Sequence, residues 1–197
     1  MAIPKVVCAT ANAHKVAEIA SILGTQVQLL PRPSTLGEID EIGDTLEHNA
    51  CLKAVTVALH VNATALADDT GLEIDALDGK PGVRSARYAG DHSDDAANRA
   101  LLLQQMHGVA HRTARFRTVI AIATPDGSCT IVEGECVGII AETELGTNGF
   151  GYDAIFIPND GDGRTFAQMS TDEKNALSHR QHALSALLDR WKSEGDI

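Results

Sequence analysis

Residues 64–71 read Thr-Ala-Leu-Ala-Asp-Asp-Thr-Gly, a short apolar run followed by two adjacent aspartates and a glycine. The pattern predicts a strand that ends where Asp68 and Asp69 meet a turn at Gly71. Because unpaired carboxylates are costly to bury, this pair is poorly placed for the interior. It could instead hold a divalent cation and keep an oxygen free to accept a proton from water. The alternative is an Asp-rich turn whose side chains cap the strand through backbone hydrogen bonds.

Helix-like and strand-like segments alternate on either side of this run. Apolar residues recur at helical spacing through residues 16–23, and Gly24 supplies a stop signal. Residues 44–60 predict a second helix, opened by capping-box spacing. Two β-rich runs, 114–124 and 130–141, flank a Pro-Asp-Gly-Ser turn and predict a long hairpin. We therefore expect an α/β fold with a mixed central sheet and flanking helices.

The composition and net charge of the chain limit the kinds of partner and function that it can have. The chain has 197 residues, of which 44% are hydrophobic and 22% charged, as in an ordinary globular domain, so we expect one domain over residues 1–197. No apolar run approaches the roughly 18 residues of a membrane span, and the expected partners exclude membranes. The formal net charge of −11 repels a phosphate backbone, which argues against nucleic acid as a partner. Basic residues that converge in such a chain would suit a small phosphorylated ligand.

The four cysteines show neither C-x-x-C nor Cys/His spacing. Cys8, Cys51, Cys129 and Cys136 are scattered along the chain and read as small apolar residues in a reducing compartment. The start of the chain leads directly into a strand-like run and shows no signal-peptide pattern. The expected location is therefore the cytoplasm.

Two lysines lie where a phosphate could bind. Residues 10–15 (Thr-Ala-Asn-Ala-His-Lys) join the first strand to the first helix, whose N-terminal N–H groups favour anions. Lys15 falls in the first turn, where the helix dipole disfavours a cation unless an anion binds. The alternative is plain capping by Thr10 or Asn12 with an exposed lysine. Lys53 borders the apolar stripe of its helix, where it could be a phosphate ligand, although a snorkelling lysine is the simpler interpretation.

Two later stretches could contact a nucleotide base and sugar. Residues 146–153 place three glycines around Phe150 and Tyr152, and such flat rings can stack on a base while Asp153 accepts hydrogen bonds. The alternative is a glycine-rich turn with aromatic plugs. Lys174 and residues 178–180 add further cations, for which a solvated helix face is the simpler interpretation. Together with a possible acidic metal ligand before residue 44, these features suit a nucleoside triphosphate.

Six stretches, in this order along the chain, carry a resemblance to a known family. They are residues 9–15 (ATANAHK), 49–54 (NACLKA), 67–77 (ADDTGLEIDAL), 81–88 (PGVRSARY), 149–153 (GFGYD) and 173–180 (EKNALSHR). With them the chain resembles the house-cleaning purine NTP pyrophosphatases, also called ITP/dITP/XTP pyrophosphatases. The resemblance implies two lobes around an active-site cleft, a homodimer, and Mg²⁺-dependent hydrolysis of ITP, dITP and XTP to the nucleoside monophosphate and pyrophosphate.

The resemblance also implies roles for single residues. Asp69 would be the catalytic base, and Asp69 with Glu41 would bind the metal, supported by Asp68. The residues expected to bind substrate are Thr10, Ala11, Asn12, Ala13, His14, Lys15, Lys53, Thr70, Phe150, Gly151, Tyr152, Asp153, Lys174, His179 and Arg180. Two other interpretations stay open, a phosphohydrolase that releases orthophosphate and a nucleotide-sensing module without turnover.

Overall fold

The computed structural model describes residues 3–90 and 94–195, and these form two compact units. Unit 1 holds the described residues through Asp69, residues 118–134 and those from Arg180 onward. Unit 2 holds residues 70–90, 94–117 and 135–179. Each unit has its own apolar core.

One sheet runs through the described residues, in the order β2-β1-β3-β5-β6-β7, with β4 paired to β3. β1 pairs in parallel with β2 and β3, while the β3–β4 and β6–β7 pairs are antiparallel. The predicted α/β fold with a mixed sheet is thus confirmed. The strands are β1 (Lys5–Cys8), β2 (Gln28–Leu30), β3 (Ala65–Ile74), β4 (Pro81–Gly82), β5 (Thr113–Ala123), β6 (Cys129–Ile140) and β7 (Phe156–Pro158).

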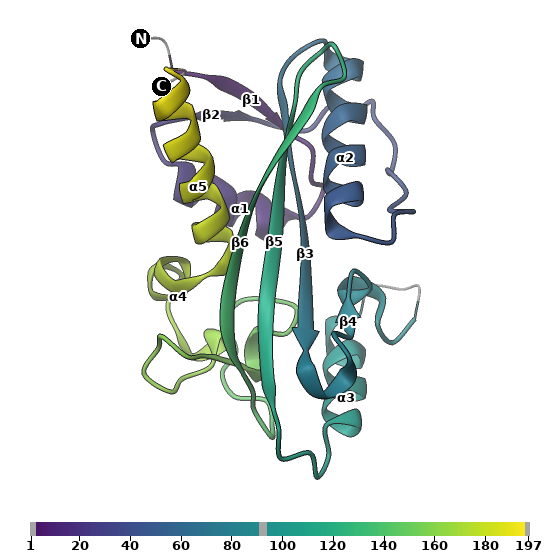
Figure 1. Ribbon diagram of the computed structural model, residues 1–197, viewed down its shortest axis with the longest axis vertical. Helices are drawn as coiled ribbons and strands as arrows, with labels where there is room; N and C mark the ends of the chain where they lie inside the picture. Colours follow the sequence, from purple (N-terminus) through teal and green to yellow (C-terminus); the bar gives the residue numbers. More distant parts are fainter. Residues whose placement is uncertain (1–2, 91–93, 196–197) are drawn as a thin grey trace. The chain divides into compact units, whose positions relative to one another are not determined.

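Unit 1 contains α1 (Ala13–Leu23), α2 (Leu46–Val61) and nearly all of α5 (His179–Glu194). Figure 1 shows α2 on one side of the unit 1 strands and α1 with α5 on the other. The α1 and α5 side of the core is built from Ile19 and Leu23 of α1, Leu184 and Leu187 of α5, and Ile120 of β5. α2 starts after the N-cap Thr45, one residue later than the capping-box spacing at Asp44 indicated.

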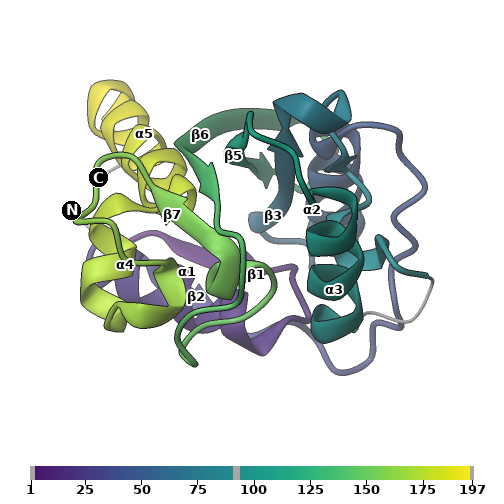
Figure 2. The same ribbon diagram turned by 90° about the horizontal axis from the view of Figure 1, so that it is seen from below.

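Unit 2 contains α3 (Asp95–Gln105) and α4 (Thr171–Leu177), which lie on opposite sides of its strands (Figure 2). Its aromatic core contains Phe116 of β5, Phe156 of β7 and Phe166, with ring centroids 4.7 to 6.2 Å apart. The short 3-10 helices are η1 (Asp75–Leu77), η2 (Ser85–Arg87), η3 (Asp153–Ile155) and η4 (Phe166–Gln168). Within the described ranges, no helix combines the length and apolar character that crossing a bilayer requires.

The interpretation of all four cysteines as thiols is wrong for two of them. Cys51 of α2 and Cys129 of β6 form a disulfide within unit 1, although they lie 78 positions apart. Cys8 and Cys136 are buried thiols, and burial raises the pKa of Cys8 to about 11 and that of Cys136 to about 12. The disulfide ties the helix that carries Lys53 to the β5–β6 hairpin.

Replacing both Cys51 and Cys129 with serine is expected to destabilise the protein. A cross-link that closes a loop of 78 residues restricts the unfolded chain, which corresponds to roughly 4.5 kcal/mol at most by loop-closure entropy. Urea unfolding of the oxidised protein, with and without a dithiol reductant, measures the loss. The reductant should shift the midpoint of the wild type and leave that of the double variant unchanged. Equal midpoints for the oxidised and reduced wild type would contradict the prediction.

Candidate active site

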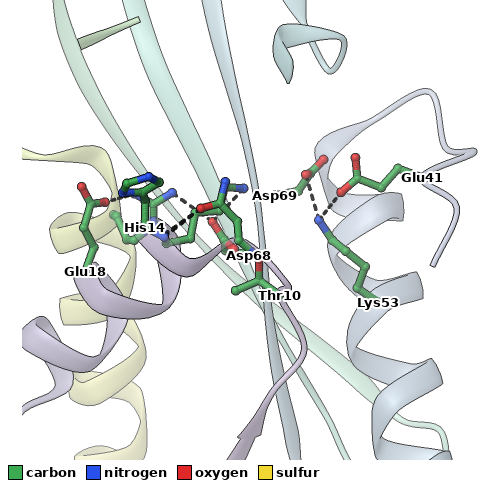
Figure 3. A network of polar contacts seen from close by, with 10 residues as sticks. Thr10, His14, Glu18, Glu41, Lys53, Asp68 and Asp69 are labelled. Carbon is green, nitrogen blue, oxygen red and sulfur yellow. Dashed lines mark hydrogen bonds and ion pairs between the residues drawn. The ribbon is translucent and has the colours of Figure 1, made fainter. Parts of the chain in front are cut away.

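The two adjacent aspartates lie inside a strand. β3 continues through Thr70 and Gly71 to Ile74, so the predicted turn is wrong. Gly71 is needed instead for the close approach of β3 to β4, because a Cβ there would lie 2.7 Å from the carbonyl oxygen of Gly82 in β4. Neighbouring side chains of a strand point to opposite faces, and Figure 3 shows Asp68 and Asp69 diverging in this way. Both carboxylates are buried, contrary to expectation, since each has cationic partners.

Lys53 joins Asp69 to the acidic loop. Its Nζ lies 3.0 Å from Asp69 Oδ1 and 2.6 Å from Glu41 Oε1 (Figure 3). Burial alone would lower the pKa of Lys53, but Asp69, Asp68 and Glu41 together raise it, so the ammonium stays charged. The snorkelling interpretation is therefore wrong, because this lysine is 7% exposed and its charged end is held by carboxylates.

The environment of Asp69 favours its protonated form more than water does. Burial raises the pKa of its carboxyl group, and the repulsion from Glu41 adds to this, while Lys53 and Lys15 oppose it. A carboxylate with a raised pKa is a stronger base than an ordinary aspartate. Asp69 is therefore a buried carboxylate of elevated basicity, with Lys53 as its cationic partner and the negative charge of Glu41 nearby.

Asp68 belongs to a buried network on the other face of β3. Its Oδ2 lies 3.1 Å from Lys15 Nζ and 3.0 Å from Arg180 Nη2. Arg180 also forms an ion pair with Glu18 of α1. Burial would raise the pKa of Asp68, but Lys15, Arg180 and Lys53 outweigh it and hold that pKa well below its usual range. Asp68 therefore stays ionised and orders the cations around it.

Glu18 belongs to the same buried network and was not predicted from the sequence. It lies beside the apolar stripe of α1, yet it is buried because Arg180 compensates its charge. Helical spacing alone gives no signal for this, since an acidic residue next to a stripe is normally solvated. The interpretation of residues 178–180 as a solvated face is wrong as well, because Arg180 is 1% exposed and His179 is buried.

The segment 10–15 forms a capped helix start. Asn12 Oδ1 accepts hydrogen bonds from the backbone N–H groups of His14 and Lys15, at 2.9 and 3.2 Å. Thr10 Oγ1 accepts from the N–H of Asn12 at 3.3 Å. Capping by Asn12 is thus confirmed, but the exposed lysine that accompanied this alternative is wrong, since Lys15 pairs with Asp68. Ala11, Ala13 and His14 are exposed, so the start of α1 is open to a ligand.

A second group of predicted residues lies together in unit 2. Lys174 Nζ lies 2.6 Å from Asp153 Oδ2 and 4.7 Å from the centroid of the Phe150 ring. The same Asp153 oxygen accepts from the N–H of Phe150 at 2.9 Å. Gly149, at φ +75°, cannot carry a side chain, because its Cβ would lie 2.0 Å from Asp153 Oδ2. The loop therefore holds a half-buried ring beside a buried ion pair.

The 150–153 loop is anchored by α3 and by a short 3-10 helix. The N–H of Gly151 donates to Asp95 at 2.7 Å, and Arg99 donates to the carbonyl of Gly151 at 2.8 Å. The hydroxyl of Tyr152 donates to the carbonyl of Ser85 at 2.8 Å, so this tyrosine is a buried anchor. Asp95, Arg99 and Ser85 were not predicted, because they lie more than 50 positions from the loop residues that they contact; Ser85 belongs to the stretch 81–88, but no contact with the loop could be inferred from that stretch.

The two remaining predicted residues are Thr70 and His179. Thr70 is a half-buried residue of β3, next to Asp69 in the chain. His179 is buried in unit 2 and stacks on Phe116, with ring centroids 4.7 Å apart and an interplanar angle of 25°. The predicted residues of unit 1 thus gather around Asp68 and Asp69, while those of the 150–153 loop gather around Lys174.

Comparison with known proteins gives one consistent result. The model of the Ham1 family matches residues 6–190. A dITP/XTP pyrophosphatase of Nitratidesulfovibrio vulgaris is 50% identical, over 94% of this chain and 95% of its own. The protein of the same name from Bacillus subtilis is 47% identical, over 92% and 93% of the two chains. The solved structure of the Staphylococcus aureus Ham1 protein is 36% identical and covers 96% of this chain and 99% of its own, with a TM-score of 0.86.

Proposed function

This chain belongs to the Ham1 family, and we propose that it is a nucleoside triphosphate pyrophosphatase. It hydrolyses deaminated purine nucleotides, namely ITP, dITP and XTP, to the nucleoside monophosphate and pyrophosphate, and so cleanses the nucleotide pool. The observation that carries this proposal is the pair of carboxylates, Asp69 and Glu41, that converge on Lys53. The dITP/XTP pyrophosphatases that resemble the chain over most of its length support the substrate class.

The carboxylate pair fits a magnesium ion. Mg²⁺ in proteins commonly takes one or two carboxylates and completes its shell with water and substrate phosphate oxygens. Asp69 and Glu41 supply such a pair, both held by Lys53, whereas no group of three or more His, Cys, Asp and Glu side chains converges anywhere over residues 3–90 and 94–195. When bound, Mg²⁺ would neutralise charge on the phosphate oxygens.

Asp69 acts as the general base. Its carboxylate takes a proton from the water that attacks the α-phosphate, and the raised pKa makes it a better acceptor. Lys53 holds Asp69 in place and offers an ammonium to the phosphates. Asp68 stays ionised and positions Lys15.

The triphosphate binds at the start of α1. The helix dipole and the first-turn N–H groups attract anions there, and this turn carries no acidic residue. Lys15, half-buried and paired with Asp68, adds a fixed positive charge. Residues 10–15 therefore offer the phosphates both backbone N–H donors and the positive charge of Lys15.

The purine is recognised by the unit 2 group. Phe150 stacks on the base with the ring face that Lys174 leaves open, and Lys174, whose Nζ lies over the ring at 4.7 Å from its centroid, is a donor without acceptor capacity. A donor suits the oxygen at purine position 6 of hypoxanthine and xanthine, whereas the amino group of adenine would face it donor to donor. A mispaired buried polar group costs about 1–3 kcal/mol, which corresponds to roughly tenfold to a hundredfold discrimination.

The test is a product assay with ITP and ATP, each with and without Mg²⁺, resolved by ion-exchange chromatography. We expect IMP and pyrophosphate from ITP, only with Mg²⁺, and ATP largely spared. IDP with orthophosphate would instead identify a phosphate-releasing phosphohydrolase. Stoichiometric binding of ITP without any product would identify a nucleotide-sensing module.

Three broader properties belong to the same proposal. The two units work as one ITP pyrophosphatase-like domain, since the family match extends over both. The protein acts in the cytoplasm, because free nucleotide triphosphates are its substrates, and it does not bind nucleic acid. It forms a homodimer, for which the exposed Leu59 on α2 offers apolar surface. Sedimentation velocity tests the dimer, and a single monomeric species would refute it.

A further inference from the structure

The loop that carries Glu41 is attached to α2 at two points. Lys53 binds the side chain of Glu41, at 2.6 Å. One helical turn earlier, the side chain of Asn49 binds the backbone of Gly43. Residues four apart lie on the same face of a helix, so α2 presents Asn49 and Lys53 to the same segment.

The Asn49–Gly43 contact uses both ends of the amide. Asn49 Oδ1 accepts from the N–H of Gly43 at 2.8 Å, and Asn49 Nδ2 donates to its carbonyl at 3.4 Å. Asn49 is 1% exposed, so water does not compete for these bonds. A shorter or apolar side chain at this position would leave both backbone groups of Gly43 without the amide.

Gly43 fits against α2 without room for a side chain. A Cβ at this position would lie 2.7 Å from Asn49 Oδ1 and 2.8 Å from His48 Cγ. Real Cβ atoms essentially never approach so closely, so even alanine would displace the loop or the side chains of Asn49 and His48 that it faces. The backbone at Gly43, two residues after Glu41, is therefore fixed by contact and by hydrogen bonding at once.

We propose that Asn49 and Gly43 form a lock that sets the position of Glu41, and thereby the affinity of the Asp69–Glu41 pair for its metal ion. Asn49 is a positioning residue, since it acts through the loop and not on substrate. The inference rests on the proposed function, in which these two carboxylates bind Mg²⁺. Losing the lock removes one of the two attachments of the loop, so that the backbone near Glu41 is less well fixed, and changes of this kind around metal ligands typically cost tenfold to a hundredfold in affinity.

The experiment measures binding of Mn²⁺ alone, as a paramagnetic substitute for Mg²⁺, by electron paramagnetic resonance. The variants are Asn49→Ala and Gly43→Ala, and a matched control is Asn98→Ala. Asn98 of α3 is also buried and also bridges a helix to a loop, with bonds to the N–H of Ala89 and the carbonyl of Ala86. Asn98 does not contact the loop that carries Glu41, so Asn98→Ala shows how losing a buried helix-to-loop asparagine affects Mn²⁺ binding when the metal site is not involved.

We expect the Kd for Mn²⁺ to rise about tenfold or more in Asn49→Ala and Gly43→Ala, and to stay unchanged in Asn98→Ala. Excess Mg²⁺ should then restore kcat in both lock variants, which a merely structural loss would not allow. If Asn49→Ala does not fold, Gly43→Ala carries the test. Wild-type Kd values in the folded lock variants would overturn the lock. Failure of a Glu41→Gln variant to weaken Mn²⁺ binding would instead overturn the metal site, and with it the proposed function as stated.

Discussion

Replacing Asp69 with asparagine is expected to lower kcat by roughly 10³-fold or more while the protein remains folded. Asparagine cannot accept the proton of the attacking water, and loss of a general base alone typically costs roughly 10²–10⁴-fold. The same substitution removes a metal ligand, which adds to the loss. Steady-state assays with ITP measure the effect, and near-UV circular dichroism checks the fold.

The fold should tolerate this change because burial already disfavours the charge of Asp69, whose pKa is raised. Lys53 keeps Glu41 as a partner in the variant. A matched control is Asp75→Asn, at an exposed aspartate outside the site, which should retain full activity. Undiminished turnover in Asp69→Asn would refute the base assignment.

The pH dependence of the activity is an independent test of Asp69 as the general base. A base works only when deprotonated, so activity should rise with pH through the pKa of Asp69 in the enzyme. That pKa is raised above the ordinary aspartate value in the metal-free enzyme, so the acidic limb of kcat/KM, which reports the free enzyme, should lie at higher pH than for a solvated aspartate. An acidic limb at the ordinary aspartate value would contradict the environment described for Asp69.

The sequence identified the chemistry of this site better than its geometry. Asp68 and Asp69 were expected at the end of a strand, because burying two carboxylates without partners is costly. The partners exist, but they come from distant positions, and the guanidinium of Arg180 is 112 residues from Asp68. Local patterns cannot indicate such a partner, so the burial of the pair could not be predicted.

Lys53 shows why local rules left two interpretations open. The helical wheel placed it at the border of the apolar stripe, where a lysine can either snorkel or bind a buried anion. The choice depends on Glu41, which lies in an irregular loop whose path follows no periodicity. The contact of Asn49 with Gly43 escaped prediction for the same reason, as did the disulfide between Cys51 and Cys129.

The elements themselves follow from local signals. The Pro-Asp-Gly-Ser turn closes the β5–β6 hairpin as predicted, with Gly127 at φ +86°. Asn12 and Ser170 cap their helices through hydrogen bonds to backbone N–H groups within three residues. Caps and turns are decided by neighbours in sequence, whereas the network around Asp68 is decided by packing.

Replacing Arg180 with methionine is expected to cost about 3–5 kcal/mol of stability at neutral pH, because it leaves Glu18 and Asp68 buried without their shared cation. Urea unfolding measures the loss. Arg190→Met is the matched control on the same helix, since the Arg190 side chain is 40% exposed and forms an i,i+4 ion pair with Glu194. That pair should contribute about 0.3–0.5 kcal/mol.

Acidification should shrink the difference between the wild type and Arg180→Met. In the wild type the folded-state pKa of Asp68 is depressed, so its contribution is present above the unfolded value, roughly 3.9, and is lost as the pH falls further. In the variant Asp68 keeps Lys15 but loses Arg180, so its pKa rises above the wild-type value and protonation relieves the cost of burying its charge at a higher pH than in the wild type. The loss at about pH 4 should therefore be smaller than at pH 7. A loss that is equal at both pH values would show that Arg180 stabilises α5 by packing and not by compensating buried charge.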